Sequence, residues 1–123
     1  MSHDIVADCL NMVMNAKKAR KSELELERYS KLLLKVFDMA KKKGYIDYKL
    51  ENKKLKVYFK NLNQCKAIKP RFYVRVEEIE KYMRRYLPAR DFGILIISTS
   101  KGLITHKEAY EKNIGGSLIA YFY

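Results

Sequence analysis

The stretch "FGILIISTSKGLITHKEAYEKNIGGSLIAYFY", residues 92–123, contains the features that decide the fold of this chain. It begins with an apolar run, residues 92–97, which is typical of a buried central strand. That run ends abruptly in three hydroxyl side chains, a lysine and a glycine, Ser98–Gly102. A buried strand that ends in such a loop could hold a nucleophile, cradle a phosphate or contact a nucleic acid.

A short helix and a final strand follow this loop. Thr105 and Glu108 have the spacing of a capping box, which predicts a helix over residues 106–112. Gly115-Gly116 predicts the break after that helix, and "SLIAYFY" predicts the last strand.

Working outward toward the N-terminus, the first half of the chain predicts the order α-β-α-β-β. The expected elements are a helix from Asp4 to about Arg20, a strand in "SELELER", a helix over 31–43 capped by Ser30 and ended by Gly44, and two strands joined at Glu51-Asn52-Lys53. The segment "NLNQCKAIKP" is a candidate boundary closed by Pro70. Beyond it, "RFYVRV" predicts a strand and "EEIEKYMRRYL" a helix that Pro88 ends.

The charge of the chain is large and unevenly distributed. The 123 residues include 48% hydrophobic side chains, enough for a core, and carry a net charge of +12. Residues 1–90 hold 23 Lys+Arg against 11 Asp+Glu, whereas residues 91–123 hold three of each sign. A globular chain with so large a positive charge most often binds nucleic acid. The alternatives are that it binds an anionic membrane surface or that its basic surface is only solvated. Any attraction to a polyanion must come from residues 1–90.

The sequence gives little support for a disulfide-bonded, metal-binding, secreted or membrane protein. Cys9 and Cys65 form no CxxC pair, a disulfide between them has no further support, and Cys9 falls on an apolar helical face. His3 and His106 have no partner at metal-ligand spacing, so we expect neither a metal nor a cofactor. The first residues lack a secretory pattern and no run approaches about 18 apolar residues, so we expect a cytoplasmic chain without membrane contact.

Ser98 and Lys101 satisfy the letters S-x-x-K of a serine nucleophile with a lysine base. That mechanism needs a desolvated lysine one helical turn from the serine, yet the motif here leaves a strand. The partner motifs S-D-N and K-T-G are absent, and no P-loop motif surrounds Lys101-Gly102. A Ser-Lys hydrolase therefore stays a remote alternative.

The same residues suit RNA recognition. Hydroxyls both donate and accept hydrogen bonds, Lys101 can contact phosphate, and Gly102 and Gly115-Gly116 let backbone approach a ligand closely. Each of these features also has a plain structural explanation, a polar strand exit for Ser98–Ser100 and a helix-to-strand turn for the glycine pair. Of the rings among the basic residues, Tyr58, Phe59, Phe72 and Tyr73, we expect most to pack in the core.

The segment "LPARDFGILIISTSKGLITHKEAYEKNIGGSLIAYFY" resembles the C-terminal half of the family of ribosomal protein number eight of the small subunit. The segments "DIVADCLNMVMNA" and "SKLLLKVFDMAKKKGYI" are similar to its N-terminal half, so the resemblance covers essentially the whole chain. The segments "CKAIKPRF" and "LPARDFGI" and the ending "AYFY" look like the archaeal and eukaryotic branch.

This resemblance implies an α+β fold of two small lobes, an α/β lobe over 1–66 and an rRNA-binding lobe of strands with short helices over 67–123. It implies a structural constituent of the small ribosomal subunit, without enzyme activity or small-molecule substrate, that binds the central domain of small-subunit rRNA directly and helps assembly. Its partners would be that rRNA and neighbouring ribosomal proteins. A stand-alone RNA chaperone or a translational repressor is the alternative. The RNA-binding residues carried over are Ser98, Thr99, Ser100, Lys101, Gly102, Gly115 and Gly116, with Asn15, Ser30 and Lys31 in the first lobe.

This chain departs from the family at some positions. Met12 and Met14 stand where bacterial members often have arginines, which leaves contacts with RNA at those positions open. The hairpin over residues 45–60 looks shorter than that of archaeal relatives.

Overall fold

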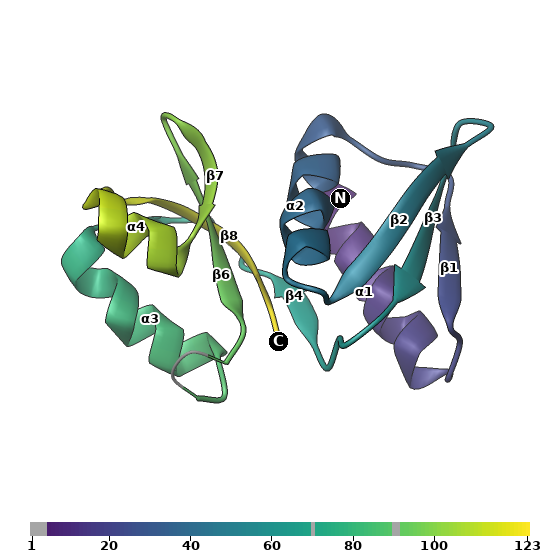
Figure 1. Ribbon diagram of the computed structural model, residues 1–123, viewed down its shortest axis with the longest axis horizontal. Helices are drawn as coiled ribbons and strands as arrows, with labels where there is room; N and C mark the ends of the chain where they lie inside the picture. The colour runs from purple at the N-terminus through teal and green to yellow at the C-terminus, as the bar shows by residue number, and fades with distance from the viewer. Residues whose placement is uncertain (1–4, 70, 90–91) are drawn as a thin grey trace. The chain divides into compact units, whose positions relative to one another are not determined.

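The computed structural model describes residues 5–69, 71–89 and 92–123 (Figure 1). Its internal contacts divide the chain into two compact units, Met1–Lys66 and Ala67–Tyr123. Each unit combines helices with antiparallel strands, which confirms the predicted α+β fold of two lobes. Asp4, the expected cap of the first helix, lies outside the described residues.

The first unit has the predicted order α-β-α-β-β. Its elements are α1 (Ile5–Lys18), β1 (Glu23–Leu26), α2 (Lys31–Lys42), β2 (Ile46–Glu51) and β3 (Lys54–Phe59). The strands form an antiparallel sheet in the order β1-β3-β2, and the two helices cover one face of it (Figure 1). Buried aliphatic and aromatic side chains of all five elements fill the space between, among them Leu10, Val13, Leu26, Phe37, Ile46, Leu55 and Val57.

Helix α2 begins and ends where its sequence predicts. The Ser30 Oγ atom accepts a hydrogen bond from the Leu33 N–H at 3.1 Å, which satisfies one of the free donors at the helix start. The side chains at helical spacing, Leu33, Val36, Phe37 and Ala40, are all buried. At the other end Gly44 adopts a φ of +80°, a left-handed conformation that glycine takes without strain.

The predicted hairpin between β2 and β3 is confirmed. Glu51 pairs with Lys54, so the turn consists of Asn52 and Lys53. Both residues have positive φ, 50° and 64°, as a two-residue turn with the twist of the adjoining strands requires.

The second unit is built around a twisted antiparallel sheet. Its elements are β4 (Cys65–Ala67, which spans the division between the units), β5 (Tyr73–Val74), a 3₁₀ turn (Val76–Glu78), α3 (Ile79–Tyr86), β6 (Ile94–Thr99), β7 (Gly102–Thr105), α4 (His106–Lys112) and β8 (Gly116–Phe122). The strand order is β4-β8-β6-β7, and β5 also pairs with β8. The apolar run at residues 92–97 is thus largely the interior strand β6, as its composition predicts.

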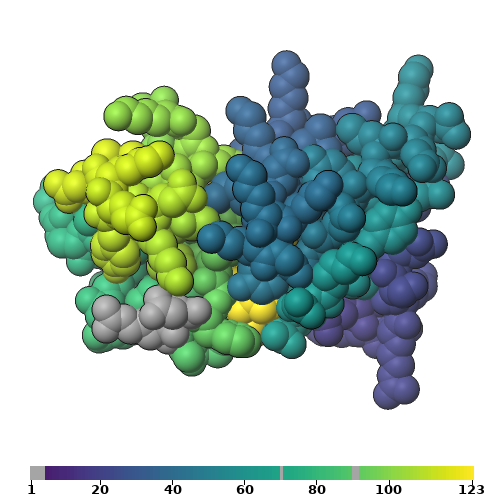
Figure 2. Space-filling model, in the orientation of Figure 1, coloured from purple at the N-terminus to yellow at the C-terminus, as the bar shows by residue number. Residues whose placement is uncertain are grey.

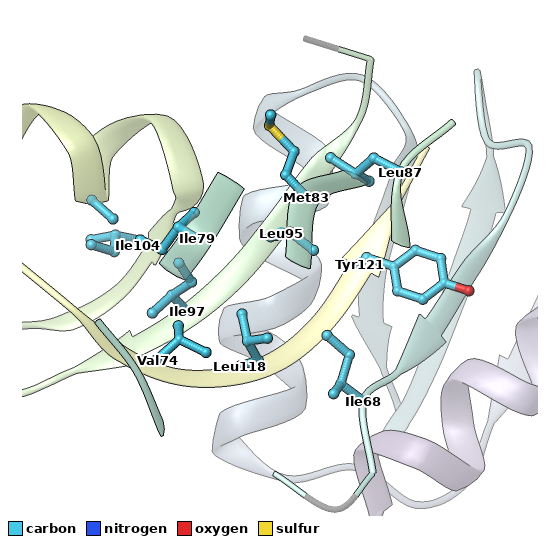
Figure 3. Close-up of a cluster of buried hydrophobic side chains, with 11 residues drawn as sticks. Ile68, Val74, Ile79, Met83, Leu87, Leu95, Ile97, Ile104, Leu118 and Tyr121 are labelled. Carbon is cyan, nitrogen blue, oxygen red and sulfur yellow. The ribbon is translucent and has the colours of Figure 1, made fainter. Parts of the chain in front are cut away.

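One face of this sheet packs against α3 and α4 (Figure 1). Ile79 of α3 lies beside Ile97 of β6, and Met83 of α3 lies near Leu95 of the same strand, as Figure 3 shows. The same cluster includes Ile68, Val74, Leu87, Ile104, Ala109, Leu118 and Tyr121. This core fixes the positions at which β6 and β8 emerge toward solvent.

Some sequence predictions were wrong in detail. The boundary segment contains a three-residue strand, β4, and Gly102–Thr105 forms β7, where no strand was expected. Of "RFYVRV" only Tyr73–Val74 is strand, since the chain turns into the 3₁₀ segment at Val76. Met12, which the spacing of the first helix predicts to widen its apolar stripe, is 44% exposed. Short strands such as β4 and β7 depend on their partners more than on their own residues.

Candidate nucleic-acid interface

The predicted loop is the tip of the hairpin between β6 and β7. Thr99 pairs with Gly102, and Ser100 and Lys101 form the turn between them. The tip projects from the surface of its unit (Figure 2). The core beneath the interior strand β6 therefore holds the base of the hairpin, while its end is accessible to a partner.

Thr99 closes this turn through its side chain. Its hydroxyl donates a hydrogen bond to the Gly102 carbonyl at 2.8 Å and accepts one from the Lys101 N–H at 3.1 Å. Gly102 has a φ of +113°, which other residues adopt only with strain. The threonine hydroxyl is thus committed to the shape of the loop, and its role differs from that of the two serines.

Ser98 and Ser100 lie on either side of Thr99. Ser98 is half-buried at the end of β6 and Ser100 is exposed. Within the parts of the chain that the structure describes, neither hydroxyl has a hydrogen-bond partner and the exposed Lys101 has no ion pair. Two hydroxyls and one ammonium group are therefore available to a ligand at a fixed position.

The glycine pair lies beside the same strand end. A Cβ atom on Gly116 would come within 2.3 Å of the Ser98 carbonyl oxygen, and one on Gly115 within 2.3 Å of the Val74 carbonyl oxygen. Both positions therefore require glycine for close packing of backbone against backbone. The structure thus brings Ser98–Gly102 and Gly115–Gly116 together, although the two segments are separated by the helix α4.

A row of side chains crosses the sheet at this end. Tyr73 of β5 pairs with Ser117 of β8, Ser117 with Ser98 of β6, and Ser98 with Leu103 of β7. Directly paired residues project on the same face of a sheet, opposite to the buried Val74, Leu118 and Ile97. Tyr73 is 66% exposed, which makes its ring available for stacking.

Ser117 and Tyr73 are absent from the residues predicted for the site, since most of the rings among the basic residues were expected to pack in the core. The alternation in "RFYVRV" carries the signal for Tyr73, because the buried Val74 places its neighbour outside. Ser117 could be found only through its pairing with Ser98.

The candidate residues of the first unit belong to two different helices, Asn15 to α1 and Ser30 with Lys31 to the start of α2. Asn15 is exposed on α1 and lines a polar cleft of about 430 Å³ with Asn11, Met14, Lys18, Gln64, Cys65 and Lys66. Amides and ammonium groups of this kind suit contact with phosphates and base edges. Sequence reasoning identified Asn15 but not the other members of the cleft.

Ser30 and Lys31 lie at the start of α2. The Ser30 hydroxyl already serves as the helix cap, so its oxygen is partly committed, whereas Lys31 is exposed. No hydrogen bond or ion pair between described residues joins this pair to Asn15. The structure therefore offers two separate positions in the first unit.

Comparison with known proteins decides the family of this chain. A family model described as Ribosomal protein S8 matches residues 4–123. The small ribosomal subunit protein uS8 of the archaeon Nanoarchaeum equitans (strain Kin4-M) is 46% identical over 132 residues, which cover all of this chain and all of that protein. The chain belongs to the ribosomal protein S8 family.

Members of the ribosomal protein S8 family are structural proteins without enzyme activity, which confirms that this chain is not an enzyme. The geometry at Ser98 agrees with this. Ser98 is in a strand and Lys101 is exposed in a turn, so the lysine is neither desolvated nor one helical turn from the serine. The Ser-Lys hydrolase alternative is therefore wrong.

The two cysteines and His106 of this S8 family member have structural roles. Burial raises the pKa of the Cys65 thiol to about 12, and burial together with the nearby Asp8 carboxylate raises that of Cys9. His106 is buried at the start of α4, where its Nδ1 atom accepts a hydrogen bond from the Leu95 N–H at 3.2 Å. Neither cysteine forms a disulfide.

Over residues 5–69, 71–89 and 92–123, no three His, Cys, Asp or Glu side chains gather as metal ligands would. In the same ranges, no helix combines the length and the apolar composition needed to cross a membrane.

Proposed function

We propose that this protein is a structural constituent of the small ribosomal subunit and that it binds the central domain of the small-subunit rRNA directly. Its place on the ribosome, in the cytoplasm, and its contact with neighbouring ribosomal proteins belong to the same proposal. Family membership supports this proposal, and one observation in the second unit supports it most directly. That observation is the pair of unpartnered hydroxyls, Ser98 and Ser100, on a turn that Thr99 closes.

The proposed interface has a rigid part that recognises local RNA shape. Ser98 and Ser100 would donate to or accept from bases and 2′-hydroxyl groups, while Lys101 would contact a phosphate. Gly115 and Gly116 would support this surface from within, because they let the neighbouring backbone of Val74 and Ser98 pack closely. Ser117 and the exposed ring of Tyr73 extend this surface across the sheet.

The other part of the proposed interface provides attraction. The 23 Lys+Arg of residues 1–90 would hold the protein on phosphates without reading sequence. Asn15 with its cleft, and Lys31 beside Ser30, are the positions in the first unit where we place such contacts. In this proposal the second unit recognises the local shape of the RNA, whereas the first unit attracts its phosphates.

A competition experiment tests this proposal. A double variant, Ser98→Ala with Ser100→Ala, should bind the rRNA central domain about tenfold more weakly, since each lost hydrogen bond costs roughly 0.5–1.5 kcal/mol. Its binding to a random RNA of equal length should hardly change. The control, Lys17→Met with Lys18→Met, should weaken binding to both RNAs by similar factors, because phosphate contacts carry no sequence information.

Equal losses on both RNAs for the serine variant would exclude recognition by the hairpin. Sedimentation of a cell lysate separates the remaining functions, since a ribosomal constituent should sediment almost entirely with small subunits and ribosomes. A stand-alone chaperone or repressor would instead remain largely in the light fractions.

A further inference from the structure

A groove between α1 and β1 differs in character from the rest of this basic chain. It has a volume of about 320 Å³ and is lined by Ile5, Asp8, Cys9 and Met12 of the helix and by Glu25, Leu26, Glu27 and Arg28 of the strand and the residues after it. The helical residues have the spacing i, i+3, i+4 and i+7, so they form one continuous face. Cys9 and Leu26 are buried at its floor.

The apolar part of the groove is open to solvent. Met12 is 44% exposed, although it continues the face of α1 that packs on β1. Methionine is an adaptable side chain that often serves in binding surfaces. Met12 thus leaves an accessible apolar surface beside the floor of the groove.

The rim of the groove is acidic. Asp8, Glu25 and Glu27 contribute three carboxylates against the single guanidinium group of Arg28. Glu25 forms an exposed ion pair with Lys54 at 3.2 Å, while Glu27 has no ion pair within the described residues. A phosphate backbone would be repelled here, whereas a basic polypeptide would be attracted.

The strand beside the groove has a free edge. In the order β1-β3-β2, β1 is an outer strand, and the carbonyl of Ser22, directly before β1, accepts a hydrogen bond from the Phe59 N–H at 3.1 Å. Because hydrogen-bonded pairs alternate in an antiparallel ladder, the backbone groups of Glu23 and Glu25 point away from β3. An extended segment can add to such an edge through backbone hydrogen bonds.

We propose that this groove and edge bind an extended, basic segment of another protein. The segment pairs with the outer edge of β1, its lysine or arginine side chains meet Glu23, Glu27 and Asp8, and one apolar side chain covers Met12. A second copy of this chain fits less well, because the glutamates of two β1 strands would face each other. Glutamates on a free edge also discourage self-association, but that role does not explain the open apolar groove next to them.

A peptide titration against the full chain tests this proposal. The probe is a fluorescent peptide of about seven residues that alternates lysine with valine and has leucine at its centre. Anisotropy gives its affinity, and backbone amide chemical shifts locate it, with the largest changes expected over residues 23–27. A peptide methylated on alternate backbone nitrogens cannot pair with the edge and should bind at least tenfold more weakly.

Protein variants complete the test. Glu27→Lys and Met12→Ala, both at exposed positions, should each lower affinity for the peptide about three- to tenfold. The matched control, Glu77→Gln with Glu111→Gln, alters exposed carboxylates of the second unit and should leave affinity unchanged. Equal binding by all variants, equal binding of the methylated peptide, or amide shifts at residues 23–27 caused by a polyuridine oligomer would each overturn the proposal.

Discussion

Each unit of this protein contains a β-hairpin with a two-residue turn, and the two turns are built differently. In the first unit the turn of Asn52 and Lys53 depends on the positive φ of both residues, and no side-chain hydrogen bond within the described residues closes it. In the second unit the Thr99 hydroxyl joins both ends of the turn, and Gly102 alone has positive φ. The first turn therefore presents an amide and an ammonium side chain on a backbone-determined turn, whereas the second presents small polar groups on a turn that a side chain closes.

The largest loss of stability that we expect follows from a substitution at Gly116, which packs beneath the second hairpin. Gly116→Ala places a methyl group 2.3 Å from the Ser98 carbonyl oxygen and 2.8 Å from Ile97 Cγ2, so backbone must move. We expect a loss of at least about 3 kcal/mol in the free energy of unfolding, measured by urea titration. Gly44→Ala, at the end of α2 where a Cβ meets nothing within 4 Å, should cost less, through φ alone. Equal losses would show that close packing at Gly116 is unimportant.

The first unit should be the more sensitive to alkali. Burial raises the pKa of Cys65 to about 12, and burial with the hydroxyl's hydrogen bond to the Asp38 carboxylate raises that of Tyr48 to about 12. Each group has a higher pKa in the folded protein than in the unfolded chain, so its protonated form contributes to the free energy of unfolding. That contribution is fully present below about pH 9 for the thiol and about pH 10 for the phenol, and it is lost as the pH rises toward 12. By pH 11 we expect the free energy of unfolding to fall by roughly 2–3 kcal/mol.

Urea titrations at pH 8 and pH 11 measure this loss. Cys65→Ala should remove most of the pH dependence, and Tyr48→Phe a smaller part. Tyr73→Phe, at an exposed position of the second unit, is the matched control and should leave the pH dependence as it is. A pH dependence that survives in Cys65→Ala with Tyr48→Phe would contradict this assignment.

A smaller effect should separate Thr99 from its neighbours. Thr99→Val keeps the shape of the side chain but loses both hydrogen bonds of the turn, which should lower the free energy of unfolding by about 1–2 kcal/mol. Thr99→Ser retains the hydroxyl and should lose much less. Ser100→Ala should leave stability unchanged, although we expect it to weaken RNA binding; a stability loss as large as that of Thr99→Val would refute this division of roles.

The smallest effect compares the lysines of the two turns. If Lys101 contacts one phosphate, Lys101→Met should flatten the dependence of log affinity for rRNA on log salt concentration by about one unit. Lys53→Met tests whether the first turn makes the same kind of contact. An identical change for both variants would show that the second hairpin contributes charge in the same way as the first.

The parts of the structure that depend on local signals could be predicted from the sequence. The cap at Ser30, the left-handed Gly44 and the Asn52-Lys53 turn each follow from residues that are neighbours in the chain. The exposed end of β6 could also be predicted, because the apolar residues of this strand are followed directly by a run of polar residues.

Other features arise only when distant residues meet. The strand β7 forms against β6, Ser117 joins the site because it pairs with Ser98, and the exposure of Met12 depends on where β1 covers α1. Helical spacing identifies which side of a helix is apolar, but it does not show how far the buried part of that side extends. The commitment of the Thr99 hydroxyl likewise depends on the positions of Lys101 and Gly102 in the folded turn.

The closed turn at Thr99 has a consequence for the thermodynamics of assembly. Ordering a flexible loop costs about 1–2 kcal/mol of conformational entropy per residue, and here that cost is incurred when the protein folds. Little of it remains to oppose association, so in calorimetry Thr99→Val should add an unfavourable entropy of binding that the native turn avoids. If the hairpin binds RNA as proposed, it is already in its final shape beforehand, and the adjustment falls to the RNA.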